Sequence, residues 1–303
     1  MSAISLQHIR KTYKEVIAVK DINLEVGDGE LFGLIGPDGA GKTTIIRILT
    51  SLMNPDSGNA LVIGLDPNKD YKELRTKIGY MPGRFSLYQD LSVEENLSLF
   101  AHLFETTIEA NYELVKDIYI QLEPFKDRKA GALSGGMKQK LALCCAMIHK
   151  PDILFLDEPT TGVDPVSRKE FWDMLKKLNK EGLTIFVSTP YMDEASLCDR
   201  VALIQSGEIL AIDTPENVNQ LFDAPLFAVN GKNKYQLLKL LKDHPACYSA
   251  YSFGSEIHFT SSEQLHADQL EAWLAQKETK DVRVKAIKPG IEDTFMRLMT
   301  KTA

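Results

Sequence analysis

A short segment near the N-terminus combines the residue types that bind a phosphate chain. It consists of Gly36, Pro37, Asp38, Gly39, Ala40, Gly41, Lys42, Thr43 and Thr44. An apolar run at 31–35 precedes it, and apolar residues with helical spacing follow it. A strand, a glycine loop and a helix in this order let backbone N–H groups surround a phosphate, while the positive end of the helix dipole faces the same anion. Lys42 is then suited to reach the β- and γ-phosphates and the Thr43 hydroxyl to coordinate Mg²⁺, so the segment predicts a site for a nucleoside triphosphate.

Two acidic residues, Asp157 and Glu158, follow the apolar run at 153–156. The apolar run is typical of a buried strand, which would carry both carboxylates to one edge of a sheet. Asp157 is suited to hold Mg²⁺, directly or through water. Glu158 is suited to orient and deprotonate an attacking water. Two acids at a strand end could also form an ordinary solvated turn, but the phosphate-binding segment upstream favours the catalytic interpretation.

A second glycine-rich segment opens a helix that we expect to run to Ile148. It consists of Leu133, Ser134, Gly135, Gly136 and Met137. Ser134 is a good N-cap, and the first turn of the helix leaves free backbone N–H groups. Taken alone, the segment is only a helix that starts with glycines. Together with the phosphate-binding segment and the acidic pair, it indicates a second helix N-terminus that faces phosphate.

The remaining pattern predicts an α/β fold. We expect half-buried strands at 4–6 and 22–26 and buried strands at 153–156, 183–188 and 201–204. The region from about 85 to 150 is helical: Ser92 and Glu95 form a capping box before one helix, and a second runs from 108 to 122, before Pro124. Asp164 and Pro165 then begin another helix. Short apolar strands that alternate with helices predict a largely parallel sheet covered on both faces.

A domain boundary is expected between 215 and 225, which divides the chain into residues 1–219 and a smaller α+β domain at 220–303. In the smaller domain the pattern gives strand, helix, two strands, helix and strand, followed by a last helix after Pro289. This order predicts a ferredoxin-like module. It contains no glycine loop, metal-ligand spacing or nucleophile motif, so a structural or dimer-stabilising role is favoured and a regulatory role is the alternative.

The composition argues against several classes of function, although it does not exclude a local basic patch. The net charge of −7 argues against broad binding of nucleic acid, which requires a basic face. The apolar run at 141–148 is too short to cross a bilayer, and the N-terminus has no signal-peptide pattern, so a membrane role would depend on a partner. The four cysteines have no metal-binding spacing, and the adjacent Cys144 and Cys145 are expected in the core. A reducing cytosol is the expected compartment.

The order of these motifs resembles the ATP-binding cassette (ABC) ATPases over residues 1 to about 215. Walker A is at 36–44, the signature at 133–137, Walker B at 153–158 and the D-loop at 161–164. The resemblance implies a P-loop NTPase cassette with a mixed sheet and a helical subdomain at about 85–150, and ATP and Mg²⁺ as cofactors. It also implies that Tyr13 stacks on adenine and that Lys42 and Glu158 are catalytic. Finally, it implies two cassettes head to tail, with each ATP between one Walker A segment and the signature and D-loop, including Asp164, of the other.

The chain looks most like the drug- and lipid-exporter branch of bacterial ABC ATPases. That resemblance implies export through a separate membrane permease, no nucleic acid partner, and a cytoplasmic subunit held peripherally on the inner face of the cell membrane. The region 85–104 would dock the permease. Soluble ABC ATPases of translation or DNA repair are an alternative class. The former usually carry two cassettes with a charged linker and the latter a long coiled coil, and neither pattern occurs in this sequence.

Two positions depart from the family pattern. Gly83 stands where the family has the Q-loop glutamine, and Pro190 where it has the switch histidine. Each lost transition-state contact typically lowers the rate by roughly 10²–10³-fold, although losses within one site need not add. The chain is therefore expected to bind MgATP and to hydrolyse it slowly at its own site. It would act as a homodimer, or as a regulatory cassette beside a second, complete ABC ATPase; both remain open.

Overall fold

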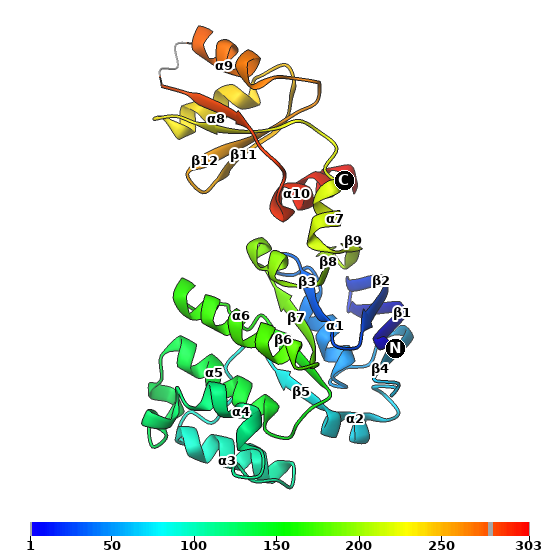
Figure 1. Cartoon of the computed structure of the whole chain (residues 1–303). Helices are drawn as coiled ribbons and strands as arrows, with labels where there is room; N and C mark the ends of the chain where they lie inside the picture. Colours follow the sequence, from blue (N-terminus) through cyan, green and yellow to red (C-terminus); the bar gives the residue numbers. More distant parts are fainter. Residues whose placement is uncertain (1, 278–280, 303) are drawn as a thin grey trace. The chain divides into compact units, whose positions relative to one another are not determined.

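The computed structural model of the chain describes residues 2–277 and 281–302. The chain divides into two compact units, the first ending at Pro215 and the second beginning at Glu216. This division falls slightly before the boundary expected after 219, because the short helix α7 (Pro215–Gln220) leads into the second unit (Figure 1). Within the described residues, no helix is both long and apolar enough to span a bilayer.

A six-stranded sheet forms the centre of the first unit. Its strand order is β5-β6-β7-β3-β8-β9. All neighbours pair in parallel except β8 and β9, which are antiparallel, so the predicted α/β class with a mixed sheet is confirmed. The strands are β3 (Leu31–Ile35), β5 (Ile78–Met81), β6 (Ile153–Asp157), β7 (Thr184–Thr189), β8 (Arg200–Gln205) and β9 (Glu208–Asp213). Every residue of β3, β6 and β7 is buried, as expected for central strands covered on both faces.

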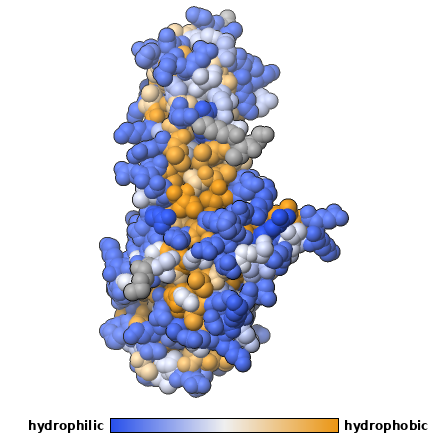
Figure 2. Space-filling view, turned by 90° about the vertical axis from the view of Figure 1, so that its right-hand side faces the viewer, coloured by the Kyte–Doolittle hydropathy of each residue, from blue (hydrophilic) through white to orange (hydrophobic). Residues whose placement is uncertain are grey.

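A second, antiparallel sheet packs with the helix that follows the phosphate-binding segment. Its order is β2-β1-β4, with β1 (Ser2–Tyr13), β2 (Val16–Gly27) and β4 (Ser57–Val62). The helix α1 (Lys42–Leu49) shares one apolar core with this sheet and with β3 and β6. On the face of the first unit that carries this sheet, hydrophilic residues surround small apolar patches (Figure 2). The sequence pattern did not reveal α2 (Tyr71–Lys77), because Leu74 is its one buried residue and it has no apolar stripe.

The helical region lies at one end of the first unit, where Figure 1 shows α3, α4 and α5 together. The helix α3 (Val93–Leu103) begins with the predicted capping box of Ser92 and Glu95. The helix α4 (Tyr112–Tyr119) is shorter than the predicted 108–122, because residues 108–111 form a turn before it and 120–122 form a turn after it. Two 3₁₀ turns follow, at Glu123–Phe125 and Ala130–Ala132. The helix α5 (Gly135–Met147) buries Cys144 and Cys145, as predicted. The long helix α6 (Pro165–Lys180) packs beside it.

The second unit has the predicted strand and helix order. It contains β10 (Leu226–Asn230), α8 (Lys234–Lys242), β11 (Cys247–Phe253), β12 (Glu256–Ser261), α9 (Ala267–Gln276), β13 (Arg283–Ala286) and α10 (Ile291–Thr302). The strands form an antiparallel sheet of order β11-β12-β10-β13, in which each βαβ pair is split by another strand. This ferredoxin-like sheet and its two helices, α8 and α9, enclose a core of their own.

Candidate nucleotide-binding site

The phosphate-binding loop connects β3 to α1, and glycine is required at two of its positions by close backbone contacts. A Cβ atom at Gly36 would lie 2.2 Å from the carbonyl oxygen of Ile204. At Gly41 it would lie 2.5 Å from the carbonyl oxygen of Ala18, and this residue also has a φ of 110°. The Gly36 N–H donates to the carbonyl of Thr189 at 3.2 Å. The loop is thus held between β8, β2 and the end of β7, and only glycine fits at its first and last turns.

Lys42 is the central cation of the site. Its side chain is 3% exposed, and its ammonium group donates to the carbonyl oxygens of Gly36 at 2.8 Å and Pro37 at 3.0 Å. It also forms an ion pair with Glu158, with 3.0 Å between Nζ and Oε1. A buried ammonium needs such partners to offset its desolvation. A phosphate group in the loop would offer the same cation stronger acceptors.

Asp157 and Thr43 form the oxygen-rich part of the site. The Thr43 hydroxyl donates to Oδ1 of Asp157 at 3.2 Å, and the Ser188 hydroxyl donates to the same oxygen at 2.7 Å. Mg²⁺ prefers one or two protein oxygens together with water and substrate phosphates. Among the described residues there is no cluster of three His, Cys, Asp or Glu side chains that could hold a metal ion by themselves. Thr43 and Asp157 are oxygen donors of the kind that could hold Mg²⁺ together with nucleotide phosphates. Burial, assisted by the Asp157 carboxylate, raises the pKa of the neighbouring Tyr80 to about 12.

Glu158 lies at the mouth of the site in a strained backbone conformation. Its φ is 50°, in the left-handed region that non-glycine residues seldom adopt. Its N–H donates to Ser188, 3.0 Å from the carbonyl oxygen and 3.1 Å from the hydroxyl oxygen, which holds this conformation. Strain of this kind is concentrated at functional sites, where it aims a side chain.

Part of the predicted loop, together with Glu158, lines a pocket of about 250 Å³. It is lined by Ala18, Gly39, Gly41, Lys42, Thr43, Thr44 and Glu158. Asp38 is exposed at the tip of the loop, and Ala40 is buried. Tyr13 is 40% exposed, and its hydroxyl lies 3.5 Å from that of Thr44, so it stands beside the loop. Stacking of Tyr13 on adenine stays a prediction.

The second glycine-rich segment begins α5 as predicted but does not line this pocket. Ser134 caps the helix by accepting from the N–H of Met137 at 3.3 Å. Leu133 is buried, whereas Ser134 and Gly135 are exposed. A Cβ atom at Gly136 would lie 2.7 Å from the hydroxyl oxygen of Ser167 on α6, which explains the glycine there.

Asp164 also lies outside the pocket and is exposed. Its side chain caps α6 by accepting from the N–H groups of Val166 and Ser167 at 3.1 and 3.0 Å. The hydrogen bonds from Ser167 lower the pKa of this carboxyl group. Asp164, Ser134 and Gly135 are therefore open to a second molecule.

Both departures from the family pattern are close to the site. A Cβ atom at Gly83 would lie 2.9 Å from the backbone oxygen of Asp157 and 3.8 Å from its carboxyl carbon. Pro190 directly follows Thr189, whose carbonyl holds the start of the phosphate-binding loop. The sequence analysis missed Ser188, which contacts both Asp157 and Glu158. The available signal was its position on the strand paired with β6, where Asp157 and Ser188 are register partners.

Comparison with known proteins agrees with this geometry. The sequence model of the ABC transporter family matches residues 19–161. The probable multidrug ABC transporter ATP-binding protein YbhF of Escherichia coli (strain K12) is 38% identical over 286 residues, which cover 93% of this chain. That alignment spans 49% of YbhF, so the chain matches about half the length of this relative. The Nod factor export ATP-binding protein I of Neorhizobium galegae is 33% identical over 300 residues, which cover 98% of this chain and 84% of the relative.

Solved structures give the same result. The ATP-binding cassette MJ0796, in a dimeric post-hydrolysis state bound to ADP and Pi, superposes with a TM-score of 0.64 at 27% identity, over 70% of this chain and 98% of that one. An ATP-binding subunit of an ABC transporter superposes with a TM-score of 0.66 at 26% identity, over 73% and 93% of the two chains. The fold and the site define a P-loop nucleotide-binding cassette. The chain belongs to the ABC transporter family of ATP-binding proteins, and such cassettes are ATPases.

Proposed function

We propose that the chain is the ATP-binding subunit of an exporter, in which MgATP binds between two cassettes and drives transport through a separate permease. The observation that carries the proposal is the pocket formed by Lys42, Thr43 and Glu158 beside the buried Asp157. These residues supply a cation for the phosphates, two oxygens for Mg²⁺ and a base for water. The multidrug and Nod factor export names of the relatives favour export.

The exposed signature supports a composite site. Ser134 and Gly135 form the N-terminus of α5 and do not line the pocket around Lys42 of their own chain. Free N–H groups at a helix start bind anions, so these residues are suited to the phosphates held by a second cassette. Two helix N-termini that face one triphosphate would stabilise its charge from both sides. The second cassette is another copy of this chain or a different ABC ATPase.

An apolar groove in the first unit supports docking of a permease segment. The groove has a volume of about 230 Å³ and is lined by Thr50, Leu52, Arg75, Ile78, Tyr80, Phe100, Phe104, Cys145, Ala146 and His149. The rings of Phe104 and His149 stack with their centroids 3.7 Å apart, and Nε2 of His149 lies within hydrogen-bond distance, 3.0 Å, of the carbonyl oxygen of Ile78. Its Nδ1 is buried and has no partner among the described residues. Phe100 belongs to α3, within the region 85–104 that was expected to bind the permease.

The permease partner would place the subunit on the cytoplasmic face of the cell membrane. The test is affinity purification of the full chain from detergent-solubilised membranes, alongside Phe104→Ala and the matched control Leu103→Ala, which alters a 66% exposed side chain. Recovery of a multi-spanning membrane protein that is lost in Phe104→Ala and kept in Leu103→Ala supports the proposal. Recovery of ribosomes or DNA in place of a membrane protein would instead favour the soluble ABC ATPases.

The altered positions favour a second candidate function, a slow or regulatory cassette. Gly83 has no side chain to approach Mg²⁺ or water, and the Pro190 side chain cannot donate to a γ-phosphate. Steady-state ATPase activity of the purified chain, measured beside Lys42→Ala and Glu158→Gln, separates the two candidates. Turnover that Glu158→Gln abolishes supports a self-sufficient motor. Tight MgATP binding without Glu158-dependent turnover supports the regulatory role, in which a complete second cassette restores hydrolysis.

A further inference from the structure

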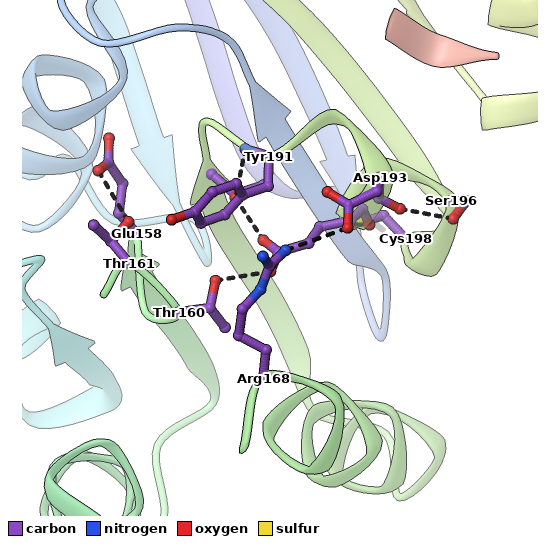
Figure 3. A network of polar contacts seen from close by, with 10 residues as sticks. Glu158, Thr160, Thr161, Arg168, Tyr191, Asp193, Ser196 and Cys198 are labelled. Carbon is purple, nitrogen blue, oxygen red and sulfur yellow. Dashed lines mark hydrogen bonds and ion pairs between the residues drawn. The ribbon is translucent and has the colours of Figure 1, made fainter. Parts of the chain in front are cut away.

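A buried carboxylate lies behind the site, outside the residues assigned above. Glu194 belongs to a 3₁₀ helix, η3 (Met192–Leu197), which follows the turn at Pro190. Its side chain is 2% exposed. One carboxylate oxygen accepts from the Thr160 hydroxyl at 2.8 Å and from the Arg168 guanidinium at 3.0 Å, and the other accepts from the Thr189 hydroxyl at 2.5 Å. Figure 3 shows Thr160, Arg168 and Tyr191 close to one another in this polar network.

Two of these donors, Thr160 and Thr189, come from segments that border the nucleotide site. Thr160 lies two positions after Glu158, at the start of the stretch that leads to Asp164. Thr189 ends β7 directly before Pro190, and its carbonyl holds the Gly36 N–H at 3.2 Å. Glu194 therefore joins the segment that follows Glu158 to the turn beside the phosphate-binding loop.

Arg168 extends the network to the helix that follows the D-loop. Its guanidinium lies 4.0 Å from the centre of the Tyr191 ring and 3.3 Å from the exposed carboxylate of Asp193. The Tyr191 N–H donates to the Thr189 hydroxyl at 3.1 Å. The turn at Pro190 is thus fixed from both sides, although Pro190 itself contributes neither an N–H nor a polar side chain.

The physical chemistry of a buried carboxylate makes this arrangement specific. A buried charge is costly unless hydrogen-bond donors satisfy it, and removal of one donor leaves the carboxylate incompletely satisfied. The carboxylate therefore favours the one arrangement in which Thr160, Thr189 and Arg168 all reach it. A displacement of about 1 Å at a catalytic group can lower a rate by roughly 100-fold, so such a constraint bears directly on hydrolysis.

We propose that Glu194 is a positioning residue for ATP hydrolysis, which locks Thr160 and Thr189 together and so sets the distance between Glu158 and the Pro190 turn. Position 190 has no histidine whose side chain could fix the turn. The hydrogen bonds of Glu194 fix it instead. The inference rests on the proposed function, in which the site of this chain turns over MgATP.

The test uses the full chain with Glu194→Gln, which keeps the shape of the side chain and removes its charge. Thr189→Val, which removes one donor, is the second variant. Asp193→Asn is the matched control, because its carboxylate pairs with the same Arg168 but is 77% exposed. We expect kcat to fall about tenfold or more in Glu194→Gln and Thr189→Val, with KM for MgATP within about twofold of the original, and no change in the control.

A second measurement, which does not require turnover, tests the inference separately from the proposed function. Trp172 lines a cavity of about 270 Å³ together with Arg168 and Glu194, and Trp273 is the other tryptophan of the chain. In a Trp273→Phe background, fluorescence therefore reports on this network. We expect MgATP to change the Trp172 emission, and Glu194→Gln to reduce that change by at least half while the Kd for MgATP stays within about twofold.

The outcomes distinguish the two ideas. Tight MgATP binding without Glu158-dependent turnover, together with a Glu194-dependent Trp172 response, would refute the self-sufficient motor and keep the role of Glu194 in positioning the Pro190 turn. An unchanged kcat and an unchanged Trp172 response in Glu194→Gln would overturn the positioning role. A simultaneous loss of ATP binding, kcat and thermal stability in Glu194→Gln would also overturn it, since that result would show that Glu194 only maintains the fold.

Discussion

The ion pair between Lys42 and Glu158 predicts that Glu158→Gln binds MgATP more tightly while it loses hydrolysis. While Lys42 is paired with the Glu158 carboxylate, 3.0 Å away, part of its positive charge is neutralised, so it attracts a phosphate less strongly. At this separation and an effective dielectric constant of about 20, the gross attraction is about 5 kcal/mol. Most of this is offset, because Glu158 is 22% exposed and Lys42 retains two carbonyl acceptors. A net effect of about 1 kcal/mol remains, which corresponds to roughly fivefold tighter binding.

The measurement is the Kd for MgATP by isothermal titration, together with steady-state turnover. Turnover should fall by roughly 10²–10⁴-fold, the usual contribution of a general base. The matched control is Glu181→Gln, because Glu181 is an exposed carboxylate at the end of α6 and should leave both quantities unchanged. Binding that is weaker or unchanged in Glu158→Gln would refute the reasoning, since the ion pair would then not compete with the nucleotide.

Three further predictions concern single positions. In Gly83→Gln, a Cβ atom 2.9 Å from the Asp157 oxygen forces the backbone to move, so the free energy of unfolding in urea should fall by about 1–3 kcal/mol without any gain in kcat. Gly83→Ala should be destabilised similarly, and a stable Gly83→Gln with faster turnover would contradict the steric argument. In Pro190→His, an imidazole able to donate to a γ-phosphate should raise kcat roughly 10- to 100-fold. An unchanged kcat would show that a side chain at position 190 does not reach the γ-phosphate. Burial lowers the pKa of His149 below its ordinary 6.5 in the folded chain. The unfolded chain therefore binds more protons than the folded chain, so the free energy of unfolding should fall as pH drops through 6.5. The melting temperature between pH 7 and pH 5 should therefore fall less in His149→Gln than in the exposed control His8→Gln; equal falls would exclude His149 as the cause.

The parts of the site that depend on neighbouring residues in the chain could be predicted from the sequence. The strand, loop and helix around Lys42 and the caps at Ser92 and Asp164 use hydrogen bonds between residues a few positions apart. Such bonds leave a pattern in the sequence. The alternation of short strands and helices was sufficient for the α/β class and for the order of elements in the second unit.

The parts that were missed depend on residues distant in the chain. Ser188 contacts Asp157 and Glu158 only because β6 and β7 pair in one particular register. The contact of Gly83 with Asp157 and the enclosure of Glu194 likewise arise from segments that the fold brings together. A single sequence does not specify register or loop packing, so these contacts could be found only in the structure.

The second unit has a core and a complete sheet of its own, which bears on how such a chain can change during evolution. Each described strand from β10 to β13 pairs within that unit, and none of them completes the sheet that carries the phosphate-binding loop. Substitutions there can accumulate, and the module can be exchanged, without altering the register of the strands that hold Asp157 and Ser188. Selection for a new regulator or assembly partner can therefore act on residues 216–303 while the chemistry of ATP stays constant.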